Sequence, residues 1–547
     1  MPRDTNCAMT QDLIRAADAL ARRLYAAGCR YAFGMPGGEV LTLSDALETA
    51  GIRFILARHE NAAAFMAEAA WHRTGAPGIL IGTLGPGVLN GINAIANAEQ
   101  DRVPLIVLAG CVDADEAETY THQVLDQRAV LAPITKATFT LTPGAAHVQA
   151  DKAVTIAMEG RMGPVHIDVP ISVANTQIAA HTPAPRAPAA PTALAGETLE
   201  TARAWLGDAK RPLMIAGVDA MNENAEASIA AFCETHNVPL VTSYKAKGTL
   251  PEDHALALGG AGLSPLADTH LLPMVEAADL IICAGYDPIE MRPGWRDPWD
   301  PTQKRVIEIM PAPAHNYMHQ ATLNVIGPVA PTLAALSDGQ TPQDTWPGGD
   351  IAACKSALAA AFPADADWGP GAIIDVCRTA LPRDTLATAD SGAHRILLSQ
   401  QWACFEPRGL IQSTALCTMG CALPMAIGTS LVEPDRTVIS FSGDAGFLMI
   451  TGELATAAEN NLKTIFLVFV DASLSLIEKK QRERQLPNAG VDFAVHDYAA
   501  MGRAFGGAGH TVENRDALRA ALEAAQSSET FTVIAAVIER GAYDGRI

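Results

Sequence analysis

Asp444 and Asp471 each follow a short apolar segment, Val438–Phe441 and Ile465–Val470, that predicts a buried parallel strand. Helical spacing of apolar residues over 452–461 predicts a strand–helix–strand unit. The carboxyl ends of such strands meet at one sheet edge, where α/β proteins bind ligands. Two carboxylates beside the backbone N–H groups of a glycine-rich turn suit Mg²⁺ carrying a diphosphate. The alternative interpretation is that both aspartates merely end their strands.

The composition is that of a globular protein with about three domains: 547 residues, 49% hydrophobic and 18% charged. The formal net charge of −21 argues against nucleic acid or an anionic membrane as a partner. Ten scattered cysteines without a CxxC pair indicate reduced thiols. The N-terminal residues lack the apolar core of a signal peptide, and no apolar run is long enough to span a membrane. We therefore expect a cytoplasmic protein.

Alternating strand and helix patterns recur along the chain and predict an α/β fold of three doubly wound parallel-sheet domains. Pro/Ala-rich or turn-rich segments without periodicity separate them and predict linkers. The expected division is a first domain at 1–175, a linker at 176–198, a middle domain at 199–337, a second linker with a short helix at 338–368 and a last domain at 369–547.

The stretch that contains both aspartates resembles the thiamine-diphosphate (ThDP) motif, which begins Gly-Asp-Gly and ends near Asn-Asn. Two positions depart from that motif: Ala445 replaces the second Gly, and Asp471-Ala472 replaces Asn-Asn. The resemblance implies that the first turn holds the diphosphate through Gly443, Asp444, Ala445 and Gly446. It also implies a Mg²⁺ ion held by Asp444, Asp471 and the backbone carbonyl of Ser473.

Motifs of the first segment resemble the pyrimidine-binding domain of ThDP-dependent carboligases and decarboxylases. Arg-His-Glu-Asn precedes an Ala-rich helix, and Gly85-Pro86-Gly87 forms a turn before the next helix. In that family the glutamate, here Glu60, hydrogen-bonds the aminopyrimidine and promotes removal of the C2 proton. By itself, a carboxylate at this place needs only the helix dipole to explain it. Gln123 matches a glutamine that points into the active site of acetolactate synthases and benzaldehyde lyase, and His122 is a candidate acid/base or substrate contact.

The last segment carries two further matches. Gly392 and His394 lie in a turn that touches the diphosphate in the family, and His394 precedes Asp444 by the expected 50 positions. Met419, in Thr-Met-Gly, matches the apolar residue that holds ThDP in its bent conformation. Leu476 and Ile477 are expected to form a wall of the substrate pocket. Alone, a methionine is more often part of the core.

Together these matches imply a ThDP- and Mg²⁺-dependent C–C lyase or carboligase that is acetolactate synthase-like. Its small-molecule substrate would be a 2-oxo acid or 2-hydroxy ketone. The family also implies a homodimer or homotetramer with active sites between subunits.

Alternatives remain open at this point. Ile171 replaces a common lysine of biosynthetic acetolactate synthases, and a tryptophan used by those enzymes is missing. Other ThDP chemistry therefore stays possible, such as that of sulfoacetaldehyde acetyltransferase, hydroxyacyl-CoA lyase or benzaldehyde-type lyase. A second alternative is an FAD-dependent oxidase of the same fold. No G-x-G-x-x-G follows a strand of the middle segment, so FAD is not supported, but family FAD sites do not need that fingerprint and FAD is not excluded. The remaining alternative is a protein that binds the cofactor without catalysis.

Overall fold

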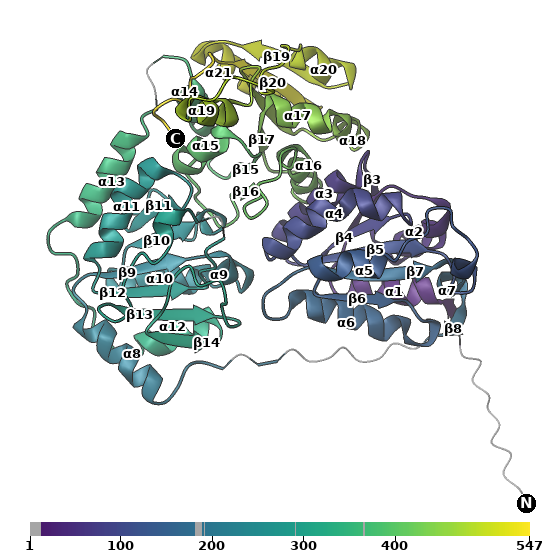
Figure 1. Ribbon diagram of the computed structural model, residues 1–547, viewed down its shortest axis with the longest axis horizontal. Helices are drawn as coiled ribbons and strands as arrows, with labels where there is room; N and C mark the ends of the chain where they lie inside the picture. Colours follow the sequence, from purple (N-terminus) through teal and green to yellow (C-terminus); the bar gives the residue numbers. More distant parts are fainter. Residues whose placement is uncertain (1–11, 181–188, 191, 290, 365–366) are drawn as a thin grey trace, which may run out of the picture. The chain divides into compact units, whose positions relative to one another are not determined.

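The computed structural model describes residues 12–180, 189–190, 192–289, 291–364 and 367–547 (Figure 1). The chain divides into two compact units, Met1–Glu99 with Val103–Pro188 and Gln100–Arg102 with Ala189–Ile547. The first unit holds one six-stranded sheet, and the second unit holds two. Neighbouring strands are parallel in all three sheets. This confirms the predicted α/β class with three doubly wound sheets.

The sheet of the first unit is purple to blue in Figure 1. Its strands lie in the order β3 (Arg53–Leu56), β2 (Tyr31–Gly34), β4 (Gly78–Gly82), β5 (Leu105–Cys111), β7 (Val165–Pro170) and β6 (Ala137–Thr140). One face packs against α1 (Ala16–Ala26), α2 (Leu41–Ala50) and α6 (Ala146–Met158). The other helices are α3 (Glu60–Thr74), α4 (Pro86–Gln100), α5 (Gln127–Leu131) and α7 (Ile171–Asn175). A small antiparallel ribbon pairs β1 (Leu13–Arg15) with β8 (Gln177–Ala179).

The middle sheet, teal in Figure 1, has a different strand order. Its strands are β11 (Ala257–Ala261), β10 (Leu240–Ser243), β9 (Pro212–Ala216), β12 (Leu280–Ala284), β13 (Arg305–Met310) and β14 (Leu323–Ile326). Its helices are α8 (Glu197–Asp208), α9 (Val218–Asn222), α10 (Glu226–His236), α11 (Pro265–Ala277), α12 (Val329–Ser337) and α13 (Asp350–Ala361).

The last sheet, green to yellow, carries the two aspartates of the ThDP-like stretch. Its strands are β16 (Leu410–Gln412), β15 (Leu386–Ala389), β17 (Val438–Gly443), β18 (Ile465–Val470), β20 (Thr532–Val537) and β19 (Ala508–Val512). One face packs against α14 (Pro370–Ala380), α15 (Ala393–Gln401) and α21 (Arg515–Gln526). The remaining helices are α16 (Ala422–Val432), α17 (Asp444–Ile450), α18 (Leu454–Glu459), α19 (Ser475–Glu483) and α20 (Tyr498–Ala504). Strand β18 is buried throughout, as its unbroken apolar run predicts.

Two predicted turns are shorter than the sequence indicates. Gly443 to Gly446 was expected to be a turn, but β17 runs to Gly443 and α17 begins at Asp444. Likewise, α4 begins at Pro86, within the expected Gly-Pro-Gly turn. Asp444 and Pro86 both suit the first position of a helix. An acidic side chain there interacts favourably with the helix dipole, and proline has no N–H group that would be left unpaired.

The expected linker at 176–198 is only partly without structure, because it contains strand β8. Helix α13 lies within 338–368, where the sequence predicts a short helix beside the linker. Residues 181–188, 191 and 365–366 of these segments lie outside the described residues. The domain boundaries themselves stay predictions. Across the part of the chain that the structure describes, none of the helices has the length and apolar character needed to cross a membrane.

Candidate active site

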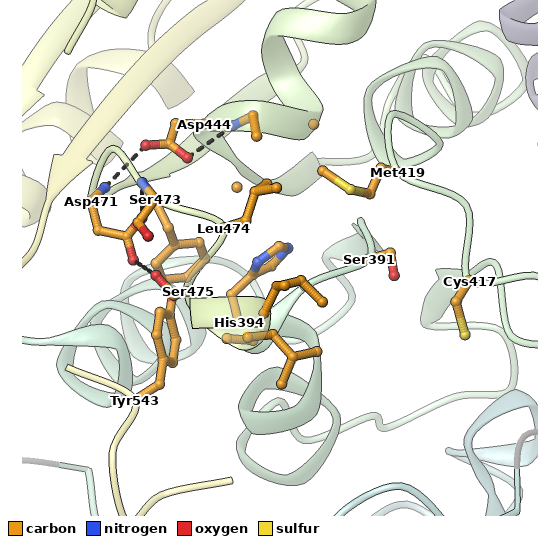
Figure 2. Close-up of a pocket in the computed structure, with 18 residues that line it drawn as sticks. Ser391, His394, Cys417, Met419, Asp444, Asp471, Ser473, Leu474, Ser475 and Tyr543 are labelled. Carbon is orange, nitrogen blue, oxygen red and sulfur yellow. Dashed lines mark hydrogen bonds between the residues drawn. The ribbon is translucent and has the colours of Figure 1, made fainter. Parts of the chain in front are cut away.

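A cavity of about 190 Å³ opens at the carboxyl edge of the last sheet (Figure 2). It lies where β15 and β17 run side by side while β16 and β18 extend the sheet in opposite directions. This is the switch point at which doubly wound sheets bind ligands. The turns after β15, β17 and β18 line the cavity together with Met419 and Tyr543.

Asp444 and Asp471 lie next to one another in this cavity, as the strand–helix–strand unit predicts. Asp444 Oδ2 accepts the backbone N–H groups of Asp471 at 3.1 Å and Ala472 at 2.7 Å. Its Oδ1 accepts the N–H of Ala445 at 2.8 Å. Burial raises the pKa of Asp444, and these N–H groups oppose that rise. The backbone of one strand end therefore fixes the carboxylate of the other.

Asp471 is held by the chain that follows it. Its Oδ1 accepts the N–H of Ser473 at 3.3 Å, and its Oδ2 accepts a hydrogen bond from the Ser475 hydroxyl. Burial raises the pKa of Asp471 to about 6; the Ser475 hydrogen bond opposes the rise and the Asp444 charge adds to it. A buried carboxylate beside a half-buried one, both with raised pKa values, forms a place where a divalent cation would be stabilised.

The oxygen ligands of this cavity suit Mg²⁺, which takes few ligands from the protein, better than a metal ion that protein side chains alone would coordinate. Among the residues described, no group of three or more His, Cys, Asp or Glu side chains is arranged to hold a metal ion. Mg²⁺ commonly takes one or two carboxylates and completes its shell with phosphate oxygens and water. The predicted third protein ligand, the carbonyl of Ser473, belongs to a residue that lines the same cavity.

His394 is packed against the glycines that surround it. A Cβ at Gly392 would lie 2.8 Å from His394 Nδ1, and a Cβ at Gly443 would lie 3.3 Å from His394 Cε1. The ring stacks on Phe469 with centroids 5.4 Å apart. Burial lowers the pKa of His394 to about 4, so the imidazole is neutral at pH 7. In the described chain its buried Nε2 has no hydrogen-bond partner. A bound polar ligand would satisfy this atom.

The remaining wall of the cavity is apolar. It is formed by Met419, Leu474, Leu476, Ile477 and Tyr543. Leu476 and Ile477, which are predicted to form a wall of the substrate pocket, line this cavity. Tyr543 comes from the C-terminal end of the chain, and its side chain is buried.

The first unit contains the predicted catalytic residue Glu60 at the start of α3. Its side chain is buried, and Asn90 Nδ2 of α4 donates to Glu60 Oε2 at 3.0 Å. A Cβ at Gly87 would lie 3.2 Å from Glu60 Oε1. The structure therefore brings Glu60 and the Gly85–Gly87 segment together.

Gln123 approaches the same segment through its backbone. A Cβ at Gly85 would lie 2.5 Å from the Gln123 carbonyl oxygen, and both residues have positive φ, +69° and +61°. The Gln123 side chain is exposed on its unit. His122 is also exposed, and its ring contacts Tyr120 edge-on at 6.2 Å. Neither side chain contacts Glu60 in any described hydrogen bond or ring contact.

Comparison with known proteins shows which family has these features. Three family profiles match in order along the chain: the thiamine pyrophosphate enzyme N-terminal TPP binding domain at residues 14–130, the central domain at 199–336 and the C-terminal TPP binding domain at 390–536. The chain belongs to the thiamine pyrophosphate enzyme family. Thiamine pyrophosphate is ThDP, so the resemblance inferred from the motifs is confirmed.

Relatives of known name match nearly the whole chain. It is 31% identical over 532 residues to an acetolactate synthase of Bacillus subtilis, covering 95% of this chain and 92% of that protein. It is 30% identical over 544 residues to a catabolic acetolactate synthase of Raoultella terrigena, covering 96% and 95%. It is also 31% identical over 547 residues to a probable 2-ketoarginine decarboxylase of Pseudomonas aeruginosa, covering 96% and 94%. The protein is therefore a ThDP-dependent enzyme of the decarboxylase and carboligase class.

The cavity of this ThDP-dependent enzyme fits a diphosphate and its metal ion. The orphaned His394 Nε2 and the glycines at 392 and 443 offer a donor and close backbone approach, and the two aspartates offer hard oxygen ligands.

Several residues that hold the site together were not among the predicted site residues. They are Asn90, Gln127, Asp390, Ser475 and Tyr543. Asp390 carries the same signal as Asp444 and Asp471, an acidic residue directly after a buried strand. Asn90 and Gln127 carry no such signal, because an amide side chain can lie at any position of an amphipathic helix. Tyr543 could be assigned only once the fold placed the C-terminus.

Proposed function

We propose that this enzyme breaks and forms carbon–carbon bonds at the carbonyl of a 2-oxo acid or 2-hydroxy ketone, as an acetolactate synthase-like carboligase. The observation that supports this best is that the Asp444–Asp471 pair, the unpaired His394 nitrogen and an apolar wall all line one cavity. The first two suit a metal-bound diphosphate, and the third suits the organic part of a substrate. Acetolactate synthases among the relatives agree with this chemistry.

The polar end of the cavity would hold the cofactor. We assign Mg²⁺ to Asp444, Asp471 and the carbonyl of Ser473. The diphosphate would lie against two sets of residues, Gly392 with His394, and Gly443 to Gly446 including Ala445. A neutral imidazole can donate one N–H to a phosphate oxygen without the cost of burying a second positive charge beside the metal ion.

Glu60 would move the proton that starts the reaction. Bound ThDP supplies a nucleophilic carbon and an electron sink for the electrons of the broken bond. Glu60 is buried beside Gly87, and Asn90 fixes its Oε2, which leaves Oε1 free to hold or release a proton toward an aminopyrimidine. General acid–base catalysis of this kind contributes roughly 10²–10⁴-fold to rate. The Gly85-Pro86-Gly87 segment would keep the approach to Glu60 open.

The apolar wall favours a substrate with a small uncharged side chain. Leu474, Leu476, Ile477 and Tyr543 offer no carboxylate or amide to a guanidinium or ammonium group. Burying such a cation there would be costly. A pyruvate-like 2-oxo acid therefore fits better than one with a basic side chain. Gln123 would orient the acceptor carbonyl, and His122 is kept as a candidate substrate contact.

The assembly that we propose is a homodimer or homotetramer with active sites shared between subunits. The first unit supplies Glu60 and the second unit supplies the metal-binding pair. In the family these two halves meet across subunits. Glu60→Gln and Asp444→Ala chains are co-expressed so that they form mixed dimers. If each site uses both chains, the mixture should have about a quarter of the active sites of the wild type. No recovery of activity would contradict the shared site.

Product analysis tests the function directly. Protein loaded with ThDP and Mg²⁺ is incubated with a panel of 2-oxo acids, 2-hydroxy ketones and aldehydes, and products are identified by mass spectrometry. Pyruvate should give one acetolactate and one CO₂ for every two molecules consumed. An aldehyde as sole product would indicate simple decarboxylation instead. No product from wild type or Glu60→Gln on any substrate would favour a binding protein without catalysis.

A further inference from the structure

Asp390 is a buried carboxylate that the chemistry described above does not use. It follows β15 directly and has no exposed surface. Its Oδ1 accepts the N–H groups of Ser391 at 2.9 Å, Gly420 at 2.8 Å and Cys421 at 3.2 Å. The Gly420 N–H also lies 3.0 Å from Oδ2, and the Cys421 thiol donates to Oδ1 at 3.5 Å. Its described hydrogen-bond partners are backbone N–H groups and one thiol, and no ion pair is described for it.

The same carboxylate fills space at the start of α17. A Cβ at Gly446 would lie only 2.1 Å from Asp390 Oδ2, so glycine is required where the two meet. Three pieces of the site thus converge on Asp390: the turn after β15 that leads to Gly392 and His394, the segment of Met419, and the first turn of α17 that begins with Asp444.

Met419 belongs to a segment that is neither helix nor strand, so other contacts must fix it. On one side, the N–H of Thr418 donates to Ser413 Oγ at 3.0 Å. On the other side, the two residues after Met419 donate their N–H groups to Asp390. Met419 is therefore held between two anchors, and the Asp390 anchor also contacts the turns on the diphosphate side, at the Ser391 N–H and at Gly446.

We propose that Asp390 is a positioning residue that sets where Met419 projects into the cavity and thereby holds bound ThDP in the conformation that Glu60 can act on. This rests on the proposed function, because Met419 supports the cofactor only if ThDP binds in this cavity. Asp390 itself touches neither substrate nor cofactor in this assignment. It acts through the backbone of Gly420 and Cys421.

The chemistry of a carboxylate explains why aspartate suits this position. Burial raises the pKa of Asp390 to about 6, and hydrogen bonds from three backbone N–H groups oppose the rise, so it is mainly ionised at pH 7. A carboxylate accepts at both oxygens and donates at neither. Asparagine has the same shape, but its NH₂ group would face the N–H of Gly420 or crowd Gly446. The Asp390→Asn variant therefore disturbs the segment of Met419 with little change in volume.

The test separates cofactor binding from cofactor conformation. ThDP affinity is measured by titration in Mg²⁺, and deuterium exchange at C2 of bound ThDP is measured by acid quench and NMR. We expect Asp390→Asn to bind ThDP within about threefold of wild type and to exchange C2 at least tenfold more slowly. Met419→Ala should behave alike. The double variant should exchange C2 no more slowly than the slower single variant, because both substitutions remove the same support of bound ThDP.

A matched control is Asp268→Asn on α11, a helix that belongs to the middle sheet's domain. Asp268 is also buried, and it accepts Trp295 Nε1 at 2.9 Å. It should lower the urea midpoint without slowing C2 exchange. If Asp390→Asn fails to fold, Asp390→Glu keeps the charge and displaces the segment of Met419, and the same slow exchange is expected.

Two results would overturn the positioning role. One is normal C2 exchange on bound ThDP with only reduced stability or affinity. The other is slowing by Asp390→Asn and Met419→Ala that multiplies in the double variant. If wild type itself neither binds ThDP nor exchanges C2, the proposed function fails instead.

Discussion

The first and last sheets have the same strand order, yet their edges differ at the equivalent place. In the first sheet β3, which follows β2 in the sequence, lies outside β2, and β4 and β5 lie on the other side. In the last sheet β16 lies outside β15 in the same way, with β17 and β18 on the other side. In the first sheet, Thr83 Oγ1 donates to Glu39 Oε2 at 2.5 Å, and a Cβ at Gly37 would lie 2.3 Å from Thr83 Oγ1. In the last sheet the corresponding crevice is the cavity of Asp444 and His394.

Each edge also has one buried polar side chain that braces its turns. In the first unit, Gln127 Oε1 accepts the N–H of Gly85 at 2.9 Å, and its Nε2 donates to Gly110 O at 3.1 Å and Asp168 Oδ1 at 2.7 Å. In the last sheet Asp390 has this place. A neutral amide both donates and accepts, whereas a carboxylate only accepts. Topology therefore places both edges, and side-chain chemistry decides which edge suits a metal-bound anion.

The largest effect should come from Glu60, the reactive group of the first sheet. Glu60→Gln keeps the hydrogen-bond partner Asn90 but cannot exchange a proton, so C2 exchange and turnover should fall by roughly 10²–10⁴-fold. The matched control is Glu68→Gln on the same helix, where Asn97 Nδ2 donates to Glu68 Oε2 at 3.1 Å. Equal losses in both variants would contradict a special role for Glu60.

The stability of the ligand-free protein should depend on pH through buried groups at the edge of the last sheet, and His394 is the first of them. The pKa of His394 is about 4 when folded and 6.5 as its ordinary value. Unfolding therefore takes up a proton between these values, and stability falls as pH drops from 6.5 to 4. Relative to His394→Gln, wild type should lose on the order of 3 kcal/mol of stability over that range.

Asp390 should give the opposite sign. Its pKa is about 6 when folded and 3.8 as its ordinary value, so the folded state binds the extra proton and stability falls as pH rises from 4 to 6. The stability difference between wild type and Asp390→Asn should follow that trend in urea titrations. The stability difference between wild type and Gln127→Leu should not vary with pH, because this substitution removes a neutral group. A pH-dependent difference for Gln127→Leu would weaken the contrast between Gln127 and Asp390.

Gln127→Leu should itself destabilise the first sheet. It leaves the buried N–H of Gly85 and the carbonyl of Gly110 without their partner, at about 2–3 kcal/mol. Chemical denaturation followed by a probe in the first unit would measure this. The neighbouring exposed Arg128→Leu serves as control and should change stability by less than about 0.5 kcal/mol.

Asp471→Asn should keep ThDP binding but weaken Mg²⁺ affinity, since one negative charge is lost and the Ser475 hydroxyl loses its charged acceptor. We expect roughly a tenfold change, about 1.4 kcal/mol, in metal titrations. Asp435→Asn, at an exposed turn, is the control. Identical titrations for wild type and Asp471→Asn would remove Asp471 from the metal shell.

The smallest effect should come from His122→Ala. The side chain is exposed and contacts only the Tyr120 ring among the contacts described, so unfolding free energy should change by less than about 0.5 kcal/mol. C2 exchange should not change, while an increase in KM for the 2-oxo acid would support its role as a substrate contact. Slower C2 exchange would show instead that His122 acts on the cofactor.

The sequence by itself determined the features that are local or that repeat along one element. The apolar runs of β15, β17 and β18 predicted the strands, and the residues that follow them, such as His394, Asp444 and Asp471, had to meet at one edge because parallel strands end together. It also determined the family, because the ThDP-like motifs keep their order and spacing over the whole chain.

Only the tertiary structure decided how those residues are held. Ser475 reaches Asp471 because α19 begins at that turn, and Tyr543 reaches the cavity because the chain returns to it after β20. Gln127 and Asp390 act on backbone N–H groups tens of residues away, and a hydrogen bond to a backbone group leaves no mark on the identity of its partner. The types of the reactive groups are therefore written in the sequence, whereas their supports follow from which segments the fold brings into contact.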